Sequence, residues 1–391
     1  MTIATDVKPD KPEPDWDPRS YSVFSNQIEA YDEMRHRCPV AYSDYLGWSL
    51  LRHEDVVRAL DDHHSFSSAV SRHLSVPSGM DPPRHTPYRK LIEHHFEPAR
   101  VLAFEPLCRA ISADLVSSLE RDVEIDLVTQ LAQHFAVRIQ CAFLGWPDCL
   151  HVPLLEWVRK NYEATLARDI VAMATIALEF DRYISQLLEA RRRVGTAAPD
   201  DITTGLLRQR IGERPLSQEE IVSILRNWTV GELGTITACV GILAHYLAQK
   251  PQLQRQLREE PGLLPAAIDE ILRLHAPLIS NRRVTTKPVE IGGRRIPAGE
   301  RVTLIWASAN RDEAVFGDPD EFRLDRDPDE NLLYGRGIHV CPGAQLARLE
   351  LRVVMEELLK GTSEIAPAPG RQPVLAIYPA SGFSALPLLI G

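Results

Sequence analysis

One long stretch between residues 217 and 250 limits the folds that this chain can adopt. Ser217, followed three residues later by Glu220, forms a capping box that marks the start of a helix. No proline interrupts the stretch before Pro251, so the helix is predicted to run to about Lys250. At 1.5 Å per residue it would be roughly 50 Å long, enough to cross a whole domain. A helix of that length needs other helices packed around it.

The middle of this helix, TVGELGTITACVG, is built mostly from small uncharged residues and should be buried. Gly231 and Gly234 each cost about 1 kcal/mol relative to alanine inside a helix. Something must therefore approach the helix closely at this point. A tight crossing with a second helix is one explanation, and a bound group lying against the helix is the other.

The rest of the chain reads as helical with a few short strands. Apolar residues recur at three- and four-residue steps from Val101 to Ala190. We predict a mainly α fold with a small β portion, made of one domain that covers residues 19–391. Residues 1–18 are polar and rich in proline, and we expect them to form a flexible lead. The expected strands lie near Trp48–Leu51, Val289–Ile291, Arg301–Ile305 and in the tail Val374–Ile390.

Composition excludes several classes of protein. The net charge of −10 makes nucleic acid an improbable general partner. No uninterrupted apolar run approaches the roughly 18 residues that span a bilayer, and the N-terminal residues carry no apolar signal core. The six cysteines are scattered, which fits neither a disulfide framework nor a zinc site and is typical of a reducing cytoplasm. We expect all of them except Cys341 to be inert core thiols.

A glycine-rich segment from Tyr334 to Leu351 places one cysteine directly before a helix. The positive end of that helix would favour the thiolate form of Cys341. A single thiolate is a suitable ligand for haem iron. The alternative is a buried structural cysteine at a helix start, but the density of glycines and the neighbouring His339 argue against it. The glycines expected to adopt conformations closed to other residues are Gly335, Gly337 and Gly343.

The segment Tyr334–Gly343 resembles the haem-binding loop of the bacterial cytochrome P-450 haem-thiolate monooxygenases. The resemblance covers nearly the whole chain. Asp81–Leu91 is similar to the family's helix that holds a haem propionate, and Glu270–Arg273 matches its ExxR pair. Asn310–Arg326 resembles the irregular segment, called the meander, between that pair and the cysteine.

The resemblance implies haem b as the cofactor, with Cys341 as the axial ligand to the iron and with Tyr334 and Gly343 in the cofactor-binding loop. Propionates pair with guanidinium and imidazolium groups through charge-assisted hydrogen bonds. The residues implied to hold them are His85, Arg89, Arg283 and His339. Glu270, Arg273 and Arg326 would form a buried structural group that holds the meander.

The sequence departs from the family pattern at two places. Tyr334 stands where a phenylalanine is usual, which keeps an aromatic ring. The family normally carries an acid directly before a helical threonine, and the two help to supply the protons for cleaving dioxygen. Here Thr235 is the threonine, but Gly234 occupies the acid position. Glu232, three residues before Thr235, is a candidate replacement; the alternative is that Glu232 points elsewhere and solvent supplies the protons.

The expected reaction inserts one oxygen atom of O2 into a small to medium apolar molecule, by hydroxylation, epoxidation or O-dealkylation. By family analogy, the residues expected around the substrate are Val230, Gly234, Leu278, Ile279 and Phe383. Two rivals remain: other haem-thiolate chemistry, either peroxide-driven oxidation or nitric oxide reduction, and a non-catalytic haem sensor. Thr235 beside small residues argues against the sensor.

The resemblance also implies redox partners, because the chain encodes no flavin or iron–sulfur module. We expect electrons from a separate ferredoxin and an NAD(P)H-dependent ferredoxin reductase, with the protein a cytoplasmic monomer. An acidic ferredoxin would dock on a basic patch formed by Lys90, Arg336, Arg348 and Arg352.

Overall fold

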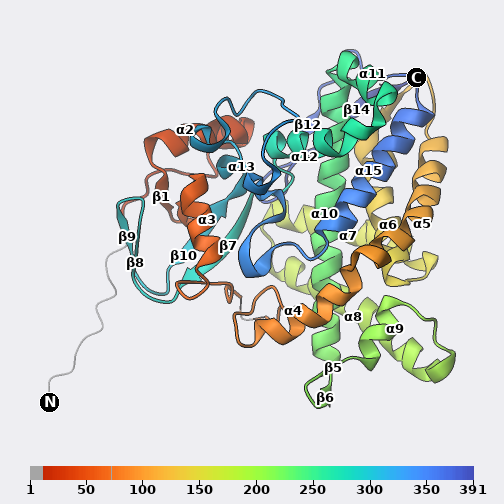
Figure 1. Cartoon of the computed structure of the whole chain (residues 1–391), viewed down its shortest axis with the longest axis horizontal. Helices are drawn as coiled ribbons and strands as arrows, with labels where there is room; N and C mark the ends of the chain where they lie inside the picture. The colour runs from red at the N-terminus through yellow and green to blue at the C-terminus, as the bar shows by residue number, and fades with distance from the viewer. Residues whose placement is uncertain (1–11, 72) are drawn as a thin grey trace.

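The computed structural model describes residues 12–71 and 73–391, and its architecture is mainly helical with a small share of strands. The predicted long helix is α10, Gln218–Ala248. It begins with the expected capping box, in which the Ser217 side chain accepts from the Glu220 N–H and the Glu220 side chain accepts from the Ser217 N–H. In Figure 1, α10 runs through the middle of the molecule, between a strand-rich side and a helical side.

The helices surround α10 mainly on the side opposite the largest sheet (Figure 1). Helix α5 packs extensively on α15, and α10 contacts α6, α8, α12 and α15. The other α-helices are α1 (Tyr21–Ser25), α2 (Gln27–Arg37), α3 (His53–Asp61), α4 (His85–Glu93), α5 (Pro98–Ser117), α6 (Gln133–Leu144), α7 (His151–Ala167), α8 (Ile170–Val194), α9 (Ile202–Arg208), α11 (Pro251–Glu259), α12 (Leu264–His275), α13 (Trp306–Ala309), α14 (Glu313–Phe316) and α15 (Ala344–Gly361).

The largest sheet has the strand order β1-β2-β10-β7-β3. Its strands are β1 (Val40–Ser43), β2 (Gly47–Leu50), β3 (Phe66–Ser67), β7 (Ser280–Thr285) and β10 (Arg301–Ile305). β2 and β10 are parallel, and the other pairs are antiparallel. The smaller sheets contain β4 (Glu124–Asp126), β5 (Arg210–Ile211), β6 (Arg214–Pro215), β8 (Val289–Ile291), β9 (Arg294–Ile296), β11 (Ile365–Pro367), β12 (Val374–Leu375), β13 (Phe383–Ala385) and β14 (Pro387–Ile390). Each strand expected from the sequence is therefore present.

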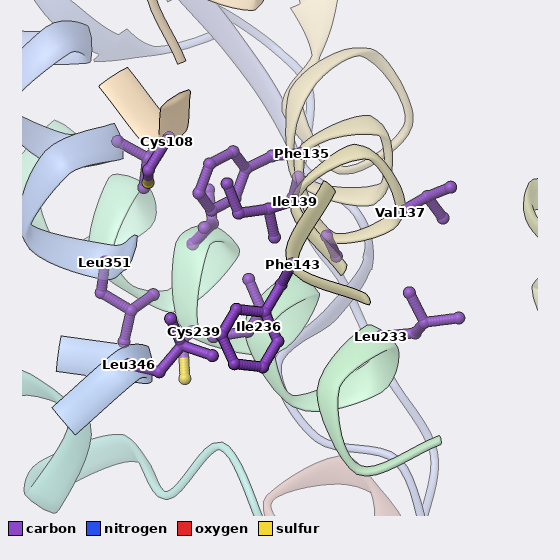
Figure 2. Packing of buried hydrophobic residues seen from close by; sticks show 14 of the residues in the cluster. Cys108, Phe135, Val137, Ile139, Phe143, Leu233, Ile236, Cys239, Leu346 and Leu351 are labelled. Atoms are coloured by element: carbon purple, nitrogen blue, oxygen red, sulfur yellow. The ribbon is translucent and has the colours of Figure 1, made fainter. Parts of the chain in front are cut away.

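The main core lies where α6, α10 and α15 meet. Figure 2 shows Phe143 of α6, Ile236 and Cys239 of α10, and Leu346 and Leu351 of α15 pointing into a common apolar space. These side chains are each at most 9% exposed. Ile236 and Cys239 are three residues apart, which places them on one face of α10. The core fixes α15, and with it the cysteine loop that precedes α15, against the middle of α10.

The N-terminal lead is shorter than the sequence indicates. Residues 1–11 lie outside the described part of the chain, but the segment from Asp15 is attached to the sheet. The Asp15 N–H donates to the Tyr42 carbonyl over 2.9 Å, and its carboxylate accepts the Tyr42 N–H over 2.7 Å. Trp16 is 9% exposed and packs edge-on against Tyr31. Residues 15–18, expected to be flexible, thus belong to the folded domain.

Two further expectations are corrected. The helical run from Val101 to Ala190 is broken by β4, which pairs with β14 from the other end of the chain. Cys149, expected to be a core thiol, is exposed, and Cys38 is half-buried.

By length and composition alone, α10 is the one helix of the described residues that could cross a membrane. Helices on several sides pack against it, which explains its apolar composition without a bilayer.

Candidate functional site

A cavity of about 410 Å³ lies between the middle of α10 and the loop that carries Cys341. Its wall includes Trp228, Gly231 and Thr235 of α10, together with Cys341 and Phe96. The α10 residues repeat at three- and four-residue steps, so they share one face of the helix. The cavity thus has an open helix face on one side and a single thiol on the other.

Gly231 and Gly234 of α10 do not serve a helix crossing. A Cβ atom built at Gly231 or Gly234 would meet nothing within 4 Å outside its own helix. The tight-crossing explanation is therefore wrong for both residues. Gly231 lines the cavity, which accounts for the absence of a side chain there.

The cysteine loop depends on two glycines with positive φ. Gly335 has φ +73° and Gly337 has φ +71°, in the region that side chains disfavour. A Cβ atom on Gly337 would also lie 2.6 Å from the Leu60 carbonyl oxygen of α3. The resulting turn allows the Cys341 N–H to donate to the Tyr334 carbonyl over 2.8 Å. Gly343 differs from the expectation, because its φ of −88° is open to any residue.

Cys341 is exposed at the cavity wall, yet desolvation by the surrounding protein still acts on its thiol. This desolvation raises the pKa of the thiol to about 11, although a hydrogen bond from the Gly343 backbone N–H acts in the opposite direction. The sequence suggested that the helix start would favour the thiolate form of Cys341. The helix start alone does not produce a thiolate. A bound metal cation would be needed to hold the sulfur deprotonated.

Four basic side chains gather at one end of the cavity. The rings of His85 and His339 lie 4.6 Å apart, and within the described residues the Nε2 atoms of both are buried without a hydrogen-bond partner. Arg283 is 5% exposed, and one of its N–H groups donates to the Arg282 carbonyl over 2.7 Å. Burial, then Arg283 and His85, lowers the pKa of His339 to about 4.

Arg89 faces the same cavity from α4. Its guanidinium donates to Glu93 over 2.7 Å and to the Val340 carbonyl over 2.6 Å, which connects α4 to the cysteine loop. Buried Arg283 is a cationic donor, and a nearby anion would favour protonation of the two unpartnered imidazole nitrogens, so this group suits an anionic ligand.

Glu232 lies on the cavity face of α10, near a second acid, Glu350 of α15. Within residues 12–71 and 73–391, Oε1 of Glu232 and both carboxyl oxygens of Glu350 are buried without a hydrogen-bond partner. Burial raises the pKa of both carboxyls. Thr235 also lines the cavity.

The residues expected around the substrate are only partly brought together. Leu278 lines the cavity. Val230 is 46% exposed, and neither Val230 nor Gly234 is part of the cavity wall. Ile279 and Phe383 line a separate cavity of about 160 Å³. In that second cavity the Phe383 ring lies 4.6 Å from the ring of His245.

Sequence reasoning missed several residues of the wall. Trp228 could have been found, because it precedes Thr235 by seven residues on the same helix face. Phe96, Gln140 and Phe143 come from other elements, and no sequence signal connects them to the site.

The group formed by Glu270, Arg273 and Arg326 anchors the meander behind the cysteine loop. Arg273 donates to Glu270 over 2.7 Å and 2.9 Å, and Arg326 donates to Glu270 over 2.9 Å. Arg273 also donates to the carbonyls of Asn310 and Pro319, and it is 1% exposed.

The expected basic patch is largely neutralised by neighbouring acids. Arg336 pairs with Asp61, and Arg348 pairs with Asp269, each over 3.1 Å. The remaining arginine of the patch, Arg352, binds both Glu105 and Glu356.

A long central helix over a single thiol, with basic groups at the cavity end, defines the haem-thiolate class of protein.

The cytochrome P450 family model matches residues 149–375. Cyclomarin C epoxidase CymV of Salinispora arenicola is 32% identical and is aligned over 81% of this chain and 84% of its own length. Mycinamicin IV hydroxylase/epoxidase of Micromonospora griseorubida is 31% identical over 80% and 81%.

Solved structures agree with these relatives. A mutant of P450 EryK in complex with erythromycin B has a TM-score of 0.85 at 28% identity, covering 94% of this chain and 96% of that one. The chain belongs to the cytochrome P450 family and is a haem-thiolate monooxygenase.

The family implies a haem, and the residues present fit one. Arg283 and the unpartnered Nε2 atoms of His85 and His339 suit the two carboxylates of the haem. The open face of α10 leaves space beside Cys341.

Proposed function

We propose that this monooxygenase inserts one oxygen atom into a small to medium apolar organic molecule, with electrons from a separate ferredoxin and its NAD(P)H-dependent reductase. The observation that carries this proposal is the cavity itself, where Cys341 faces the open helix face of α10. Haem b, when bound, supplies the activation of O2, and a thiolate ligand favours cleavage of the O–O bond.

The protein's own residues hold the cofactor and orient the substrate. Cys341 is the proposed axial ligand, in the loop bounded by Tyr334 and Gly343. Arg283 and the two histidines would bind the propionates. Arg89 lines the same cavity and would join them.

The cavity wall supports an apolar substrate. Phe96, Phe143, Trp228 and Leu278 provide aromatic and aliphatic surface. Gln140 is already engaged, since its side-chain amide donates to Thr229 over 3.2 Å. Hydroxylases and epoxidases among the relatives are consistent with hydroxylation or epoxidation, and O-dealkylation follows from hydroxylation next to an ether oxygen.

Glu232 and Thr235 are the proposed proton-handling residues, because both line the cavity while Gly234 provides no acid. Solvent is the alternative proton source. The rival haem-thiolate reactions, peroxide-driven oxidation and nitric oxide reduction, would not need a relay tuned for O2. A haem sensor would need no substrate space.

We propose a ferredoxin as the electron donor because the resemblance to the family implies a separate protein that supplies electrons. The three arginines of the expected basic patch are paired with acids, which weakens the argument that the patch attracts an acidic ferredoxin. A ferredoxin would have to displace those acids, namely Asp61 from Arg336, Asp269 from Arg348 or Glu105 from Arg352. We place the protein in the cytoplasm as a monomer on the basis of its bacterial relatives and scattered thiols.

Replacing Cys341 by serine tests the proposal. The variant should lose the thiolate spectrum of the reduced carbon monoxide complex and all product formation. Cys149→Ser is the matched control, because that thiol is exposed and lies outside the cavity wall. A Cys341→Ser protein that keeps the parent spectrum would refute the assignment. Parallel assays with ferredoxin plus O2, with peroxide and with nitric oxide would separate the three chemistries.

A further inference from the structure

Trp306 is a buried residue of the cavity wall whose polar atom has no hydrogen-bond partner. It directly follows β10, is 6% exposed, and lines the cavity together with Tyr334 and Gly335. Within residues 12–71 and 73–391, its indole Nε1 is buried and makes no hydrogen bond. An indole N–H can only donate, and a buried donor without an acceptor costs free energy. A group bound in the cavity could supply that acceptor.

Two other tryptophans have a similar indole but a different position. The Nε1 atoms of Trp16 and Trp48 are also buried without a partner in the described part of the chain. Neither residue belongs to the wall of the cavity beside Cys341. An unpartnered indole is therefore not in itself a sign of a binding site. Trp306 differs from the other two because it lies in the cavity wall.

The largest sheet places Trp306 on the same face as Arg283. In the antiparallel pair of β7 and β10, Val302 lies opposite Arg283. Side chains two residues apart on a strand point to the same face, which relates Val302, Leu304 and Trp306. Ile305 has φ −91° and ψ 90°, so the chain is still extended just before Trp306. Val302, Leu304 and Trp306 also pack in one apolar cluster, which agrees with a shared face.

The indole ring also borders the loop that carries Cys341. A Cβ atom built on Gly335 would lie 3.8 Å from Cη2, at the far end of the Trp306 ring. Helix α3 packs against both α13 and β10 (Figure 1), and its Leu60 belongs to the apolar cluster of Trp306 and to the cavity wall. The ring is therefore held between the sheet, α3 and the cysteine loop.

We propose that the indole N–H of Trp306 donates a hydrogen bond to a carboxylate of the haem, as a fifth donor beside Arg89, Arg283, His85 and His339. This inference rests on the proposed assignment of those four residues to the propionates. A carboxylate has about four lone-pair sites, so it can accept from several donors at once. The indole adds a hydrogen bond without adding a positive charge, so it does not repel the buried Arg283. Unlike an imidazole, it donates at every pH.

Transfer of haem from the holoenzyme to apomyoglobin tests the proposal without turnover. Trp306→Phe removes the N–H and keeps an aromatic ring. Trp48→Phe is the matched control, because it removes a buried, unpartnered indole of the same apolar cluster that lies outside the cavity wall. We expect haem to leave Trp306→Phe about ten-fold faster than the parent, because a hydrogen bond to a charged group is lost. Trp48→Phe should release haem at the rate of the parent.

A second measurement separates the lost hydrogen bond from a general loosening of the cavity wall. The propionate-bending band in the resonance Raman spectrum of the haem shifts when a hydrogen bond to the carboxylate is removed. This band should shift in Trp306→Phe and stay in place in Trp48→Phe. An unmoved band in Trp306→Phe, or equal haem transfer rates in the two variants, would overturn the proposal.

If Trp306→Phe does not fold, Trp306→Gln and Trp306→Leu decide. The two new side chains are similar in size, but only glutamine keeps an N–H donor. We expect Trp306→Gln to retain haem about ten-fold longer than Trp306→Leu, and equal retention would overturn the proposal. The thiolate spectrum of the reduced carbon monoxide complex should be that of the parent in every variant that holds haem. A failure here is therefore distinct from a failure of the Cys341 assignment.

Discussion

Replacing Gly337 by alanine should loosen the cysteine loop by an amount that the structure allows to be worked out. A residue with a Cβ atom at φ +71° pays about 1–2 kcal/mol of backbone strain. The new Cβ atom would also lie 2.6 Å from the Leu60 carbonyl oxygen, which belongs to backbone and cannot rotate away. Overpacking of this kind costs about 1–3 kcal/mol more. Gly337→Ala should therefore lose about 2–5 kcal/mol of unfolding free energy.

Gly299→Ala is the matched control. Gly299 has φ +79°, but a Cβ atom there would meet nothing within 4 Å, so only the strain of about 1–2 kcal/mol remains. Urea unfolding followed by circular dichroism gives both free energies. Transfer of haem to apomyoglobin then reports whether the loop still holds the cofactor, and it should accelerate only in Gly337→Ala. Indistinguishable values for the two variants would refute the reasoning from Leu60.

Three other changes have defined outcomes. Glu270→Ala should lower the free energy of unfolding in urea by about 3–5 kcal/mol, because it leaves the buried Arg273 unpaired. As a control, Asp325→Ala removes an exposed ion pair and should leave the urea midpoint nearly unchanged. Burial lowers the pKa of His95 from 6.5 to about 4, so the unfolded chain binds more protons than the native protein between these values. This contribution to the free energy of unfolding is complete above pH 6.5 and is lost as the pH falls, by about 3 kcal/mol at pH 4. His95→Leu should therefore make the free energy of unfolding depend less on pH between pH 4 and 6.5. Parallel pH curves for the parent and the variant would contradict the assignment. Pro342→Leu adds an amide donor beside the ligating sulfur and should raise the haem reduction potential, measured by redox titration. An unchanged or lower potential would mean that Pro342 serves only to start the helix.

The elements that the sequence predicted well carry local signals. The capping box at Ser217 and the absence of proline before Pro251 determine α10, and both are contained in one stretch of chain. The strands β8 and β10 were expected at Val289–Ile291 and Arg301–Ile305 and are found with those bounds. The resemblance added motifs with fixed spacing, and the bonded group around Glu270 follows from them.

Several of the misses share a physical cause, because they depend on chain segments far apart in sequence. Phe383 lies beside His245 in the second cavity, a position set by how the C-terminal strands fold back. Arg336 is neutralised by Asp61, which is 275 residues away. Glu350 has no motif of its own in the sequence reasoning, and only the packing of α15 on α10 brings it to Glu232.

The three-stranded sheet β11-β14-β4 has a consequence for the order in which the chain can fold. Its middle strand, β14, is the last element of the sequence, whereas β4 is formed by residues 124–126. On a ribosome, β4 and β11 would leave the exit tunnel with no strand between them to accept their hydrogen bonds. The Asp122 N–H, which donates to the Ile390 carbonyl over 2.8 Å, would also wait until β14 has emerged. We therefore expect this edge of the helical core to close only after β14 has left the exit tunnel, and the nascent protein to be most vulnerable to proteolysis near residues 118–127 until then.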